Sequence, residues 1–431
     1  MGAKKSPILN RTLFTGDNLE IMRVMNSESV DLIYLDPPFN KKYVFPIGKG
    51  DAAKFGFKDV WGWDSAPDES NPYLPYAELY SYAELVAATV NDNPLIDKKM
   101  ADNIVSFLDA MGKIAGHSEM AYLSFMATRL VEMRRILKKS GSIYLHCDPT
   151  MSHPLKLLMD CVFGQQQFIN ELIWYYTNAS RGKKRFAKSH DVIFWFSKSL
   201  PPRFNREKIL APFASGMTQW RYTKGGQVSQ PMPQGKTPDD VLTLPALNAM
   251  SKERTGYPTQ KPIELLEYII ITSSNDGDMV LDPFCGCATT CIAAERLNRQ
   301  WIGIDVASNA AGLVRHRLLD ETKQGKIDDE RVPSIIHCSA DKGELPMRTD
   351  MGKARSKNIR SILYGKQAGN CNLCKRHFEI RDFHIDHIIA RNKGGPDVDD
   401  NLQLLCGSCN AIKSDRTMEK ARERLKMLGY I

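Results

Sequence analysis

The chain has 431 residues, enough for two or three domains, and its 42% hydrophobic and 25% charged content is typical of a globular protein. No apolar run is long enough to span a bilayer, and the N-terminus lacks the apolar block of a signal peptide, so we expect a cytoplasmic protein with no membrane partner. A net charge of +8 suits an anionic partner, although many proteins of this charge have none.

The first well-marked element is residues 30–35, VDLIYL, which are apolar except for Asp31. Such a run is typical of a strand buried on both faces of a parallel sheet. The strand must end at Asp36, because Pro37 and Pro38 lack the N–H that a ladder needs. Ligands bind at this end of parallel strands, so Asp36 is a candidate site residue. On these residues alone, a rigid turn whose acid caps a neighbouring group stays open.

A further strand is predicted at residues 142–146, after an amphipathic helix at 125–139 with a basic end. Two stretches interrupt the regular pattern. Residues 41 to about 115 are rich in Asp, Pro, Tyr and Ala, and we interpret them as an insertion with some helix. Residues 177–250 show little periodicity and carry basic clusters.

Residues 279–305 predict one β-α-β unit that ends at Asp305. Small residues in its turn let the backbone approach a ligand, and an acid after the second strand suits ribose hydroxyls. The turn departs from the dinucleotide fingerprint, so a nucleoside without a pyrophosphate is the compatible ligand. The unit consists of a strand at 279–281, a turn at 282–288, a helix at 289–297 and a strand at 301–304. Alternating strands and helices over residues 10–320 predict a doubly wound α/β domain.

Taken together, these motifs resemble the amino-methylating DNA methyltransferases of the permuted β group, which have a Rossmann-like fold and use S-adenosylmethionine. The resemblance covers most of residues 10–320, with the catalytic motif before the cofactor motif. It rests on FTGDNLEIM at 14–22, LDPPFN at 35–40, RLVEMRRILKKSGSIYLHCD at 129–148, FINELIWYY at 168–176, YPTQKP at 257–262 and LDPFCGCATT at 281–290.

The resemblance implies a role for each residue of the first motif. The target base is swung out of the duplex, Asp36 and the carbonyl of Pro37 accept hydrogen bonds from its amino group, Pro38 fixes the loop, and Phe39 stacks on the base. An Asp before Pro-Pro favours adenine N6 over cytosine N4, although the group includes both kinds of enzyme.

The same resemblance implies a cofactor pocket. The turn is its least secure part, because the family's usual Ser-Gly is Cys287-Ala288 here and Ala tolerates a positive φ less well than Gly. The pocket residues would be Asp17, Thr259, Gln260, Lys261, Asp282, Phe284, Gly286, Thr289, Thr290 and Asp305.

Residues 177–250 would form the segment that reads the DNA sequence. Solvated surface charges are the alternative for each of its basic residues. The expected DNA contacts are Arg181, Lys183, Lys184, Arg185, Arg221 and Lys224.

The ten cysteines fall into two groups. Those before residue 340 are interpreted as buried, reduced thiols without a metal. The other four form two C-x-x-C pairs, and they fit a closed zinc site in a segment with little core of its own. These are Cys371, Cys374, Cys406 and Cys409. A charge-rich linker at 341–362 separates the domain of residues 1–340 from this second domain at 363–431.

The segment around these pairs resembles the HNH endonucleases, with HIDHI, a Gly-Gly loop, NLQLLC and CN-x-x-K in the family's order. The resemblance implies a zinc-stabilised ββα domain in which His387 is the general base and Asn401 fixes its loop. Asp386 and Asn410 would hold Mg²⁺, and Lys413 would contact phosphate. The third signature position is Asn rather than His.

The expected protein is therefore a two-activity enzyme on double-stranded DNA, acting in restriction-modification or phage defence. One alternative is a solitary methyltransferase whose zinc module only binds DNA. Another is a nuclease that cuts only methylated DNA. The sequence leaves open whether the chain forms a homodimer.

Overall fold

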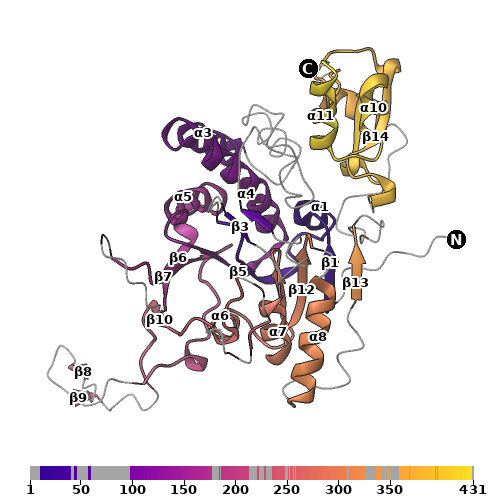
Figure 1. Ribbon diagram of the computed structural model, residues 1–431. Coiled ribbons are helices and arrows are strands. Elements are labelled where there is room, and N and C mark those ends of the chain that lie inside the picture. Colours follow the sequence, from indigo (N-terminus) through magenta and orange to yellow (C-terminus); the bar gives the residue numbers. More distant parts are fainter. Residues whose placement is uncertain are drawn as a thin grey trace.

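The computed structural model gives the architecture of both domains (Figure 1). Two small hairpins, β3 (Tyr43–Phe45) with β4 (Phe57–Asp59) and β8 (Arg221–Tyr222) with β9 (Val228–Ser229), stand apart from the main sheet. The structure describes residues 10–39, 43–45, 57–59, 98–176, 184, 186–212, 221–222, 228–229, 235–247, 251, 253–255, 257, 259–307, 310–325, 336–340, 345, 348, 359–367, 369–393, 395 and 397–429.

Within these residues, nine strands form one sheet in the order β10-β6-β7-β5-β2-β11-β12-β1-β13. Strand β7 is antiparallel to both neighbours, and every other pairing is parallel. The bounds are β1 Thr12–Thr15, β2 Val30–Leu35, β5 Leu137–Cys147, β6 Phe168–Tyr175, β7 His190–Ser197, β10 Val241–Thr243, β11 Met279–Asp282, β12 Gln300–Asp305 and β13 Ile336–Ser339.

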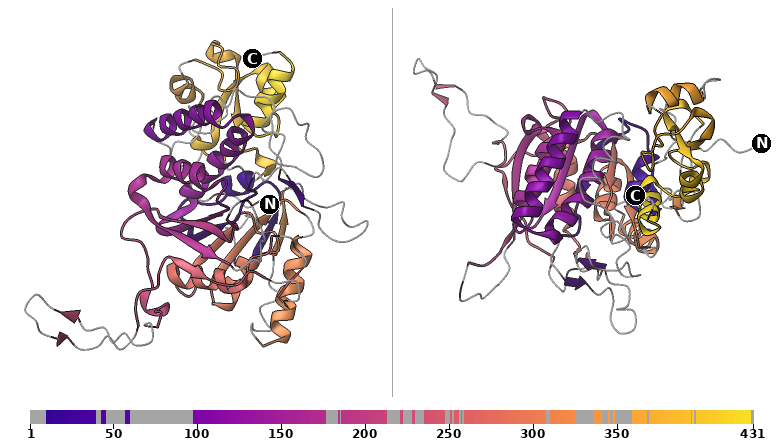
Figure 2. Two further views of the ribbon diagram at one scale, coloured as in Figure 1. Left: turned by 60° about the vertical axis from the view of Figure 1, so that its left-hand side comes forward. Right: turned by 90° about the horizontal axis from the view of Figure 1, so that it is seen from above.

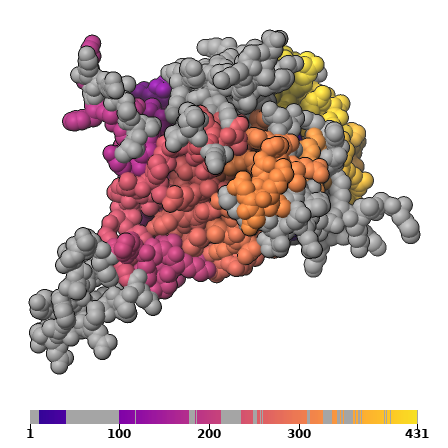
Figure 3. All heavy atoms as spheres, turned by 60° about the horizontal axis from the view of Figure 1, so that its bottom comes forward, coloured from indigo at the N-terminus to yellow at the C-terminus, as the bar shows by residue number. Residues whose placement is uncertain are grey.

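Helices cover both faces of this sheet, which confirms the doubly wound α/β prediction (Figures 1 and 2). On β2, Ile33 and Leu35 pack into the core beneath the first group of helices, whereas Leu32 and Tyr34 pack into the core on the other face. The first group is α1 (Asn18–Arg23), α3 (Lys98–Ile114), α4 (His117–Ile136) and α5 (Ser152–Phe163). The second is α6 (Ile263–Ser273), α7 (Thr289–Arg296) and α8 (Ala310–Lys323). Figure 3 shows the molecule from below, with part of the C-terminal domain in yellow at the margin of this view.

The described parts of the two interrupting stretches contribute to this framework. Helix α3 lies in the segment that the sequence suggests is an insertion, yet its Ile104 and Leu108 are fully buried in the core with α4 and α5. Strands β7 and β10 lie in the predicted recognition segment and belong to the sheet. None of the helices in the described ranges combines the length and the apolar character needed to cross a membrane.

The C-terminal domain has its own core and the expected ββα order. Its two strands pair antiparallel, and α10 follows them directly. The elements are α9 (Ile359–Lys366), β14 (Phe383–His387), β15 (Leu402–Cys406), α10 (Gly407–Lys413) and α11 (Met418–Met427). Short 3-10 turns are η3 (Gln165–Gln167), η4 (Arg206–Lys208), η6 (Ile380–Asp382), η7 (Arg391–Lys393) and η8 (Asp399–Asn401).

Charged side chains join the two domains where α11 meets α1. The Arg23 guanidinium donates to both oxygens of Glu419, at 2.7 and 3.0 Å. Glu20 accepts from Lys420 at 3.2 Å and lies 3.7 Å from Lys393. Glu419 is 4% exposed, and the nearby Arg23 charge helps to hold its pKa at about 2 against the opposing effect of burial.

Candidate active and metal sites

Four carboxylates gather at one edge of the large sheet. Asp36 follows β2, Asp282 ends β11, Asp305 ends β12 and Asp17 follows β1, and these four strands are consecutive neighbours in the sheet. Both aspartate motifs therefore meet at the carboxyl edge, as the sequence predicts. Thr15 in β1 pairs with Asp305 in β12, which fixes the register at this edge.

Asp282 and Asp305 are buried acids held by the turn between β11 and α7. The Thr290 hydroxyl donates to Asp282 Oδ2 at 2.5 Å, and the Phe284 N–H donates to Oδ1 at 3.1 Å. Burial, reinforced by the charges of Asp36 and Asp305, raises the pKa of Asp282 to about 7. Burial also raises the pKa of Asp305, although two backbone N–H groups donate to it. The site therefore favours a cation that lets both acids ionise.

The turn itself has two residues with a positive φ. Gly286 has φ +49°, donates its N–H to Asp305 Oδ2 at 2.7 Å, and a Cβ there would lie 3.0 Å from the Tyr257 ring. Ala288 has φ +55° and is fully buried. The chain thus keeps the left-handed turn with an alanine where the family usually has glycine, at a strain of about 1 kcal/mol.

Asp17 lies at the start of α1 and is fixed by a buried arginine that the sequence did not suggest. Arg129, on α4, donates to Asp17 Oδ1 at 2.8 Å and to Asn18 Oδ1 at 2.7 Å. The Asn18 amide donates in turn to the carbonyl of Pro283, in the second aspartate motif. Arg129 is the first residue of the 129–148 segment that carries the family resemblance, and this is the only feature of the sequence that could have drawn attention to it.

Asp36 has one occupied and one unoccupied oxygen. Its Oδ2 forms an ion pair with the Lys261 ammonium, which also lies 5.5 Å from the Phe39 ring centroid. Its Oδ1 is buried and has no hydrogen-bond partner among the described residues. An unpaired buried carboxylate oxygen is costly, so this atom marks a place where a hydrogen-bond donor belongs.

Two residues of the 257–262 motif, both expected in the cofactor pocket, have partners within the protein. Lys261 pairs with Asp36. Gln260 accepts from Thr255 at 2.7 and 2.8 Å and donates to the Glu253 carbonyl at 2.8 Å. Gln260 therefore fixes the fold of its own loop.

A ring cluster that the sequence analysis missed stands behind Phe39. The buried His146 ring, at the end of β5, is stacked against Phe39 with 6.3 Å between centroids, and Trp174 meets its edge at 5.6 Å. Asp191 and Tyr34 lie at the two ring nitrogens of His146. His146 lies inside the YLHCD part of the resemblance, but nothing in the local pattern indicates these partners.

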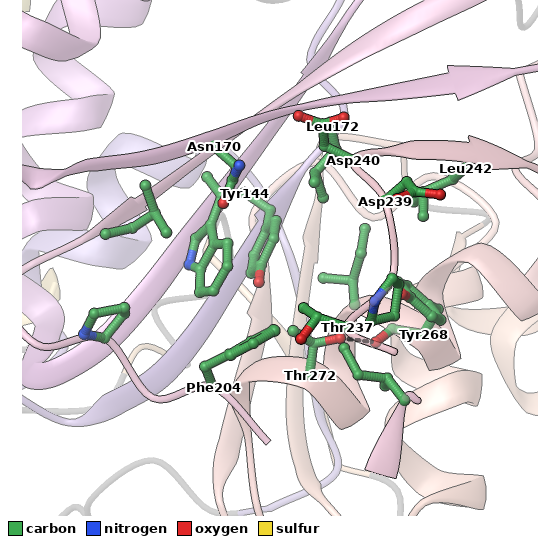
Figure 4. A pocket seen from close by; sticks show the side chains of 16 residues that line it. Tyr144, Asn170, Leu172, Phe204, Thr237, Asp239, Asp240, Leu242, Tyr268 and Thr272 are labelled. Atoms are coloured by element: carbon green, nitrogen blue, oxygen red, sulfur yellow. Dashed lines mark hydrogen bonds between the residues drawn. The ribbon is translucent and has the colours of Figure 1, made fainter. Parts of the chain in front are cut away.

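Of the expected DNA contacts, Lys184 is exposed and Arg221 lies in β8. Arg181, Lys183, Arg185 and Lys224 lie outside the described residues. A cavity of about 450 Å³ lies between the sheet and α6, and residues of the predicted recognition segment form part of its wall. Tyr144, Asn170, Phe204 and Tyr268 are among the residues that line it (Figure 4). It contains none of the predicted site residues.

The four C-terminal cysteines converge on one point. Their sulfur atoms all lie within 4.8 Å of one another, and the Sγ atoms of Cys374 and Cys406 are 4.0 Å apart. Tetrahedral zinc with Zn–S bonds of about 2.3 Å needs sulfurs about 3.8 Å apart. Cys371, Cys374, Cys406 and Cys409 therefore fit a closed structural zinc site.

The nuclease-like residues lie at the end of the β14–β15 hairpin. The side-chain oxygen of Asn401 accepts from the Ile389 N–H at 2.9 Å, and its side-chain nitrogen donates to the Ile389 carbonyl at 3.1 Å. These two hydrogen bonds hold the chain just beyond His387. Asp397 and Arg391 both approach His387 Nε2, at 3.0 and 3.2 Å. Arg391 Nε–H is the donor in its contact with Nε2, and its terminal nitrogen forms an ion pair with Asp397 at 3.0 Å, so the two residues together hold the imidazole from one side.

Lys413, which was expected to contact phosphate, lies inside the C-terminal domain. Its side chain is completely buried, with its ammonium 2.9 Å from Asp386 Oδ2 and 2.6 Å from the His387 carbonyl. Gln403 donates to the same Asp386 oxygen at 2.9 Å. In this position the ammonium stabilises the hairpin from inside, so the structure gives no support to the predicted phosphate contact. Asp386 and Asn410 remain as candidate Mg²⁺ ligands, on β14 and α10.

A doubly wound sheet with acids at its carboxyl edge, beside an Asp-Pro-Pro-Phe loop, defines a methyltransferase of Rossmann type. The comparisons agree: residues 30–314 match the DNA methylase family model of the N6/N4 type, and the chain belongs to that family. Residues 371–416 match the HNH endonuclease model, so an HNH domain follows the methylase domain.

Curated relatives include type II methyltransferases. M.EcaI of Enterobacter cloacae is 30% identical over an alignment of 261 positions, which covers 46% of this chain and 58% of the relative. M.HpaI of Haemophilus parainfluenzae is 32% identical over 213 residues, 49% of this chain and 64% of the relative. The DNA adenine methyltransferase YhdJ of Escherichia coli strain K12 is 26% identical over 311 residues, 72% of this chain and 82% of the relative. The chain thus spans less than two thirds of the length of the first two.

Proposed function

We propose that this protein methylates an amino group of a DNA base, most simply adenine N6, and cuts DNA with its HNH domain, in a restriction-modification or phage-defence system of the cytoplasm. The observation that carries the first activity is the buried, unpaired Oδ1 of Asp36 beside an Oδ2 held by Lys261. Adenine is favoured by the Asp before Pro-Pro and by the similarity to an adenine methyltransferase.

Asp36 provides the chemistry at the base. Its Oδ1 accepts one N–H of the flipped base's amino group, while the carbonyl of Pro37 accepts the other. An aryl amine shares its lone pair with the ring, and two acceptors that pull the nitrogen toward tetrahedral geometry return that pair to nitrogen. Lys261 keeps the carboxylate oriented, and Phe39 provides the face on which the base stacks.

The acid edge fits S-adenosylmethionine, a cationic nucleoside that supplies an electrophilic methyl group when bound. Asp305, next to the glycine turn, would hold the ribose hydroxyls, and Asp282 and Asp17 would face its positive charges. Proximity of amine and methyl group then supplies much of the rate enhancement.

The second activity rests on the HNH domain. His387 would activate water against a phosphodiester, held in place by Asn401 through Ile389. Asp386 and Asn410 offer the hard oxygen ligands that Mg²⁺ prefers, and Mg²⁺ would stabilise charge on the phosphate. The four cysteines would hold the structural zinc.

Two variants separate the activities. Asp36→Ala should abolish methyl incorporation into plasmid DNA and leave cleavage intact, and His387→Ala should do the reverse. His384→Ala is the matched control, since His384 is an exposed residue on the same strand as His387. Methylation by Asp36→Ala at the wild-type rate would refute the catalytic assignment.

Cleavage of unmodified and previously methylated DNA, with Mg²⁺, then identifies the system. Cutting only of unmodified DNA means a self-protecting restriction enzyme, and cutting only of methylated DNA means a modification-dependent one. If neither is cut while methyl groups are incorporated, the alternative of a solitary methyltransferase with a DNA-binding zinc module is correct.

A further inference from the structure

We propose that His146 and Asp191 form a positioning pair for the target base, acting through Phe39. This inference rests on the proposed methyl transfer and names residues that neither aspartate motif contains. His146 is the penultimate residue of β5, Asp191 is the second residue of β7, and the two strands pair side by side in the sheet.

The imidazole of His146 has a fixed orientation, because it is fully buried and both ring nitrogens have partners. Nδ1 lies 2.7 Å from the Tyr34 hydroxyl, and Nε2 lies 3.1 Å from Asp191 Oδ2. Tyr34 lies two residues before Asp36, so the pair is connected to the strand that carries the first motif.

The proton positions follow from these contacts. Burial, and then the charge of Asp36, raise the pKa of Tyr34 well above its ordinary value, so Tyr34 keeps its phenolic proton. Its hydroxyl then donates to Nδ1, which leaves Nε2 to carry the ring proton and donate to Asp191. Every polar atom of the imidazole is satisfied in this single arrangement, and the ring cannot rotate without breaking both hydrogen bonds.

The fixed imidazole ring of His146 supports the Phe39 ring from one side. The two rings lie at an interplanar angle of 24°, with 6.3 Å between centroids, and Phe39 is 7% exposed. Asp191 also accepts from the Tyr176 hydroxyl at 3.1 Å, and Tyr176 packs against Trp174 with 4.9 Å between centroids. Asp191 thus organises the rings on one side of Phe39, and the base would stack on the opposite side.

Such a role predicts a specific kinetic change. With the imidazole free to turn, Phe39 loses its fixed plane and the flipped base spends less time stacked in the reactive position. The contacts given above involve no residue of β11, β12 or α1, which carry the expected cofactor site. We therefore expect the methyl-transfer step to slow while affinity for S-adenosylmethionine stays unchanged.

The experiment compares His146→Phe, which retains a ring but loses both hydrogen bonds, with Asp191→Ala and with the conservative Asp191→Asn. Glu171→Gln, at an exposed acid on the neighbouring strand β6, is the matched control. The duplex carries the site mapped from the methylation that the wild type leaves on plasmid DNA. Three quantities are measured: the single-turnover methylation rate, the fluorescence of 2-aminopurine at the target position, and the dissociation constant of S-adenosylmethionine.

We expect His146→Phe and Asp191→Ala to slow single-turnover methylation by about tenfold or more, the loss typical of a buried hydrogen bond to a charged group. Their 2-aminopurine signal should change, their cofactor affinity should stay within about twofold of wild type, and Asp191→Asn should recover most of the rate. Wild-type rates and fluorescence in both variants would overturn the inference. So would a loss of cofactor affinity equal to the loss of rate, since that indicates a purely structural role. A wild type that transfers no methyl group would instead refute the proposed function.

Discussion

Asp282 predicts a pH dependence of cofactor binding that can be worked out from the structure. With a pKa of about 7, the carboxyl is about 90% protonated at pH 6 and about 90% ionised at pH 8. If the cationic cofactor binds the ionised form, its apparent dissociation constant should fall about tenfold between these two pH values. Binding should also release protons at pH 6, because the cofactor drives Asp282 to ionise.

Ionisation of Asp282 favours cofactor binding but lowers the free energy of unfolding of the ligand-free domain. Because the folded-state pKa lies above the ordinary value of 3.8, the carboxyl favours the fold most in acid, and this stability is lost as the pH rises from about 4 to about 7. The difference of about three pH units corresponds to about 4 kcal/mol at pH 8. Asp282→Asn should therefore make the ligand-free domain more stable at pH 8 while weakening cofactor binding.

Isothermal titration calorimetry of S-adenosylmethionine at pH 6, 7 and 8, in two buffers of different ionisation enthalpy, measures both the affinity and the protons released. The cofactor's own amino group titrates too, so the decisive quantity is the difference between the wild type and Asp282→Asn. Equal pH dependence in the two proteins would show that Asp282 is not the titrating group.

Three further predictions concern the turn, the zinc site and the domain contact. Ala288→Val should weaken cofactor binding more than tenfold in calorimetry, because a β-branched residue is strongly disfavoured at φ +55°, whereas Ala288→Gly should stay within about threefold. Removing zinc with a chelator should unfold the C-terminal domain, seen by limited proteolysis, and stop cleavage while methylation continues. Glu419→Gln should release the C-terminal domain from α1 at pH 7, which limited proteolysis would detect as faster cleavage between the two domains. In the wild type, the same contact should weaken as the pH falls from about 4.5 toward 2. The pKa of Glu419 is depressed to about 2, so its ionised carboxylate stabilises the contact most above pH 4.5.

The strand ends of the methyltransferase domain were predictable because they are local. An apolar run stopped by Pro37 and Pro38 must end at Asp36 or just before it, and β2 ends at Leu35; the same reasoning places the end of β11 at Asp282. Since parallel strands share an edge, the meeting of the two motifs follows from the alternating pattern. The cysteine spacing predicted its cluster for the same reason.

The contacts that complete the sites could not be predicted in this way. Lys261 reaches Asp36 across 225 residues, and Arg129 reaches Asp17 across 112, so neither pair leaves a local pattern. Lys413 is a second example. From the sequence, a lysine in a short motif is expected to be exposed, but Lys413 is buried because the hairpin packs around it. Propensity and spacing describe the chain near a residue, whereas these pairings depend on which strands become neighbours.

Helix α1 has a consequence for engineering chimeric enzymes from this chain. It is only about 9 Å long, and it carries Asp17 and Asn18 at one end and Glu20 and Arg23 on the turn that faces the nuclease. Transplanting residues 363–431 onto another methylase would bury Glu419 without its cation unless the recipient's first helix also carried an arginine there. A working graft must therefore transfer two surfaces together: the C-terminal module and one turn of a helix almost 400 residues upstream.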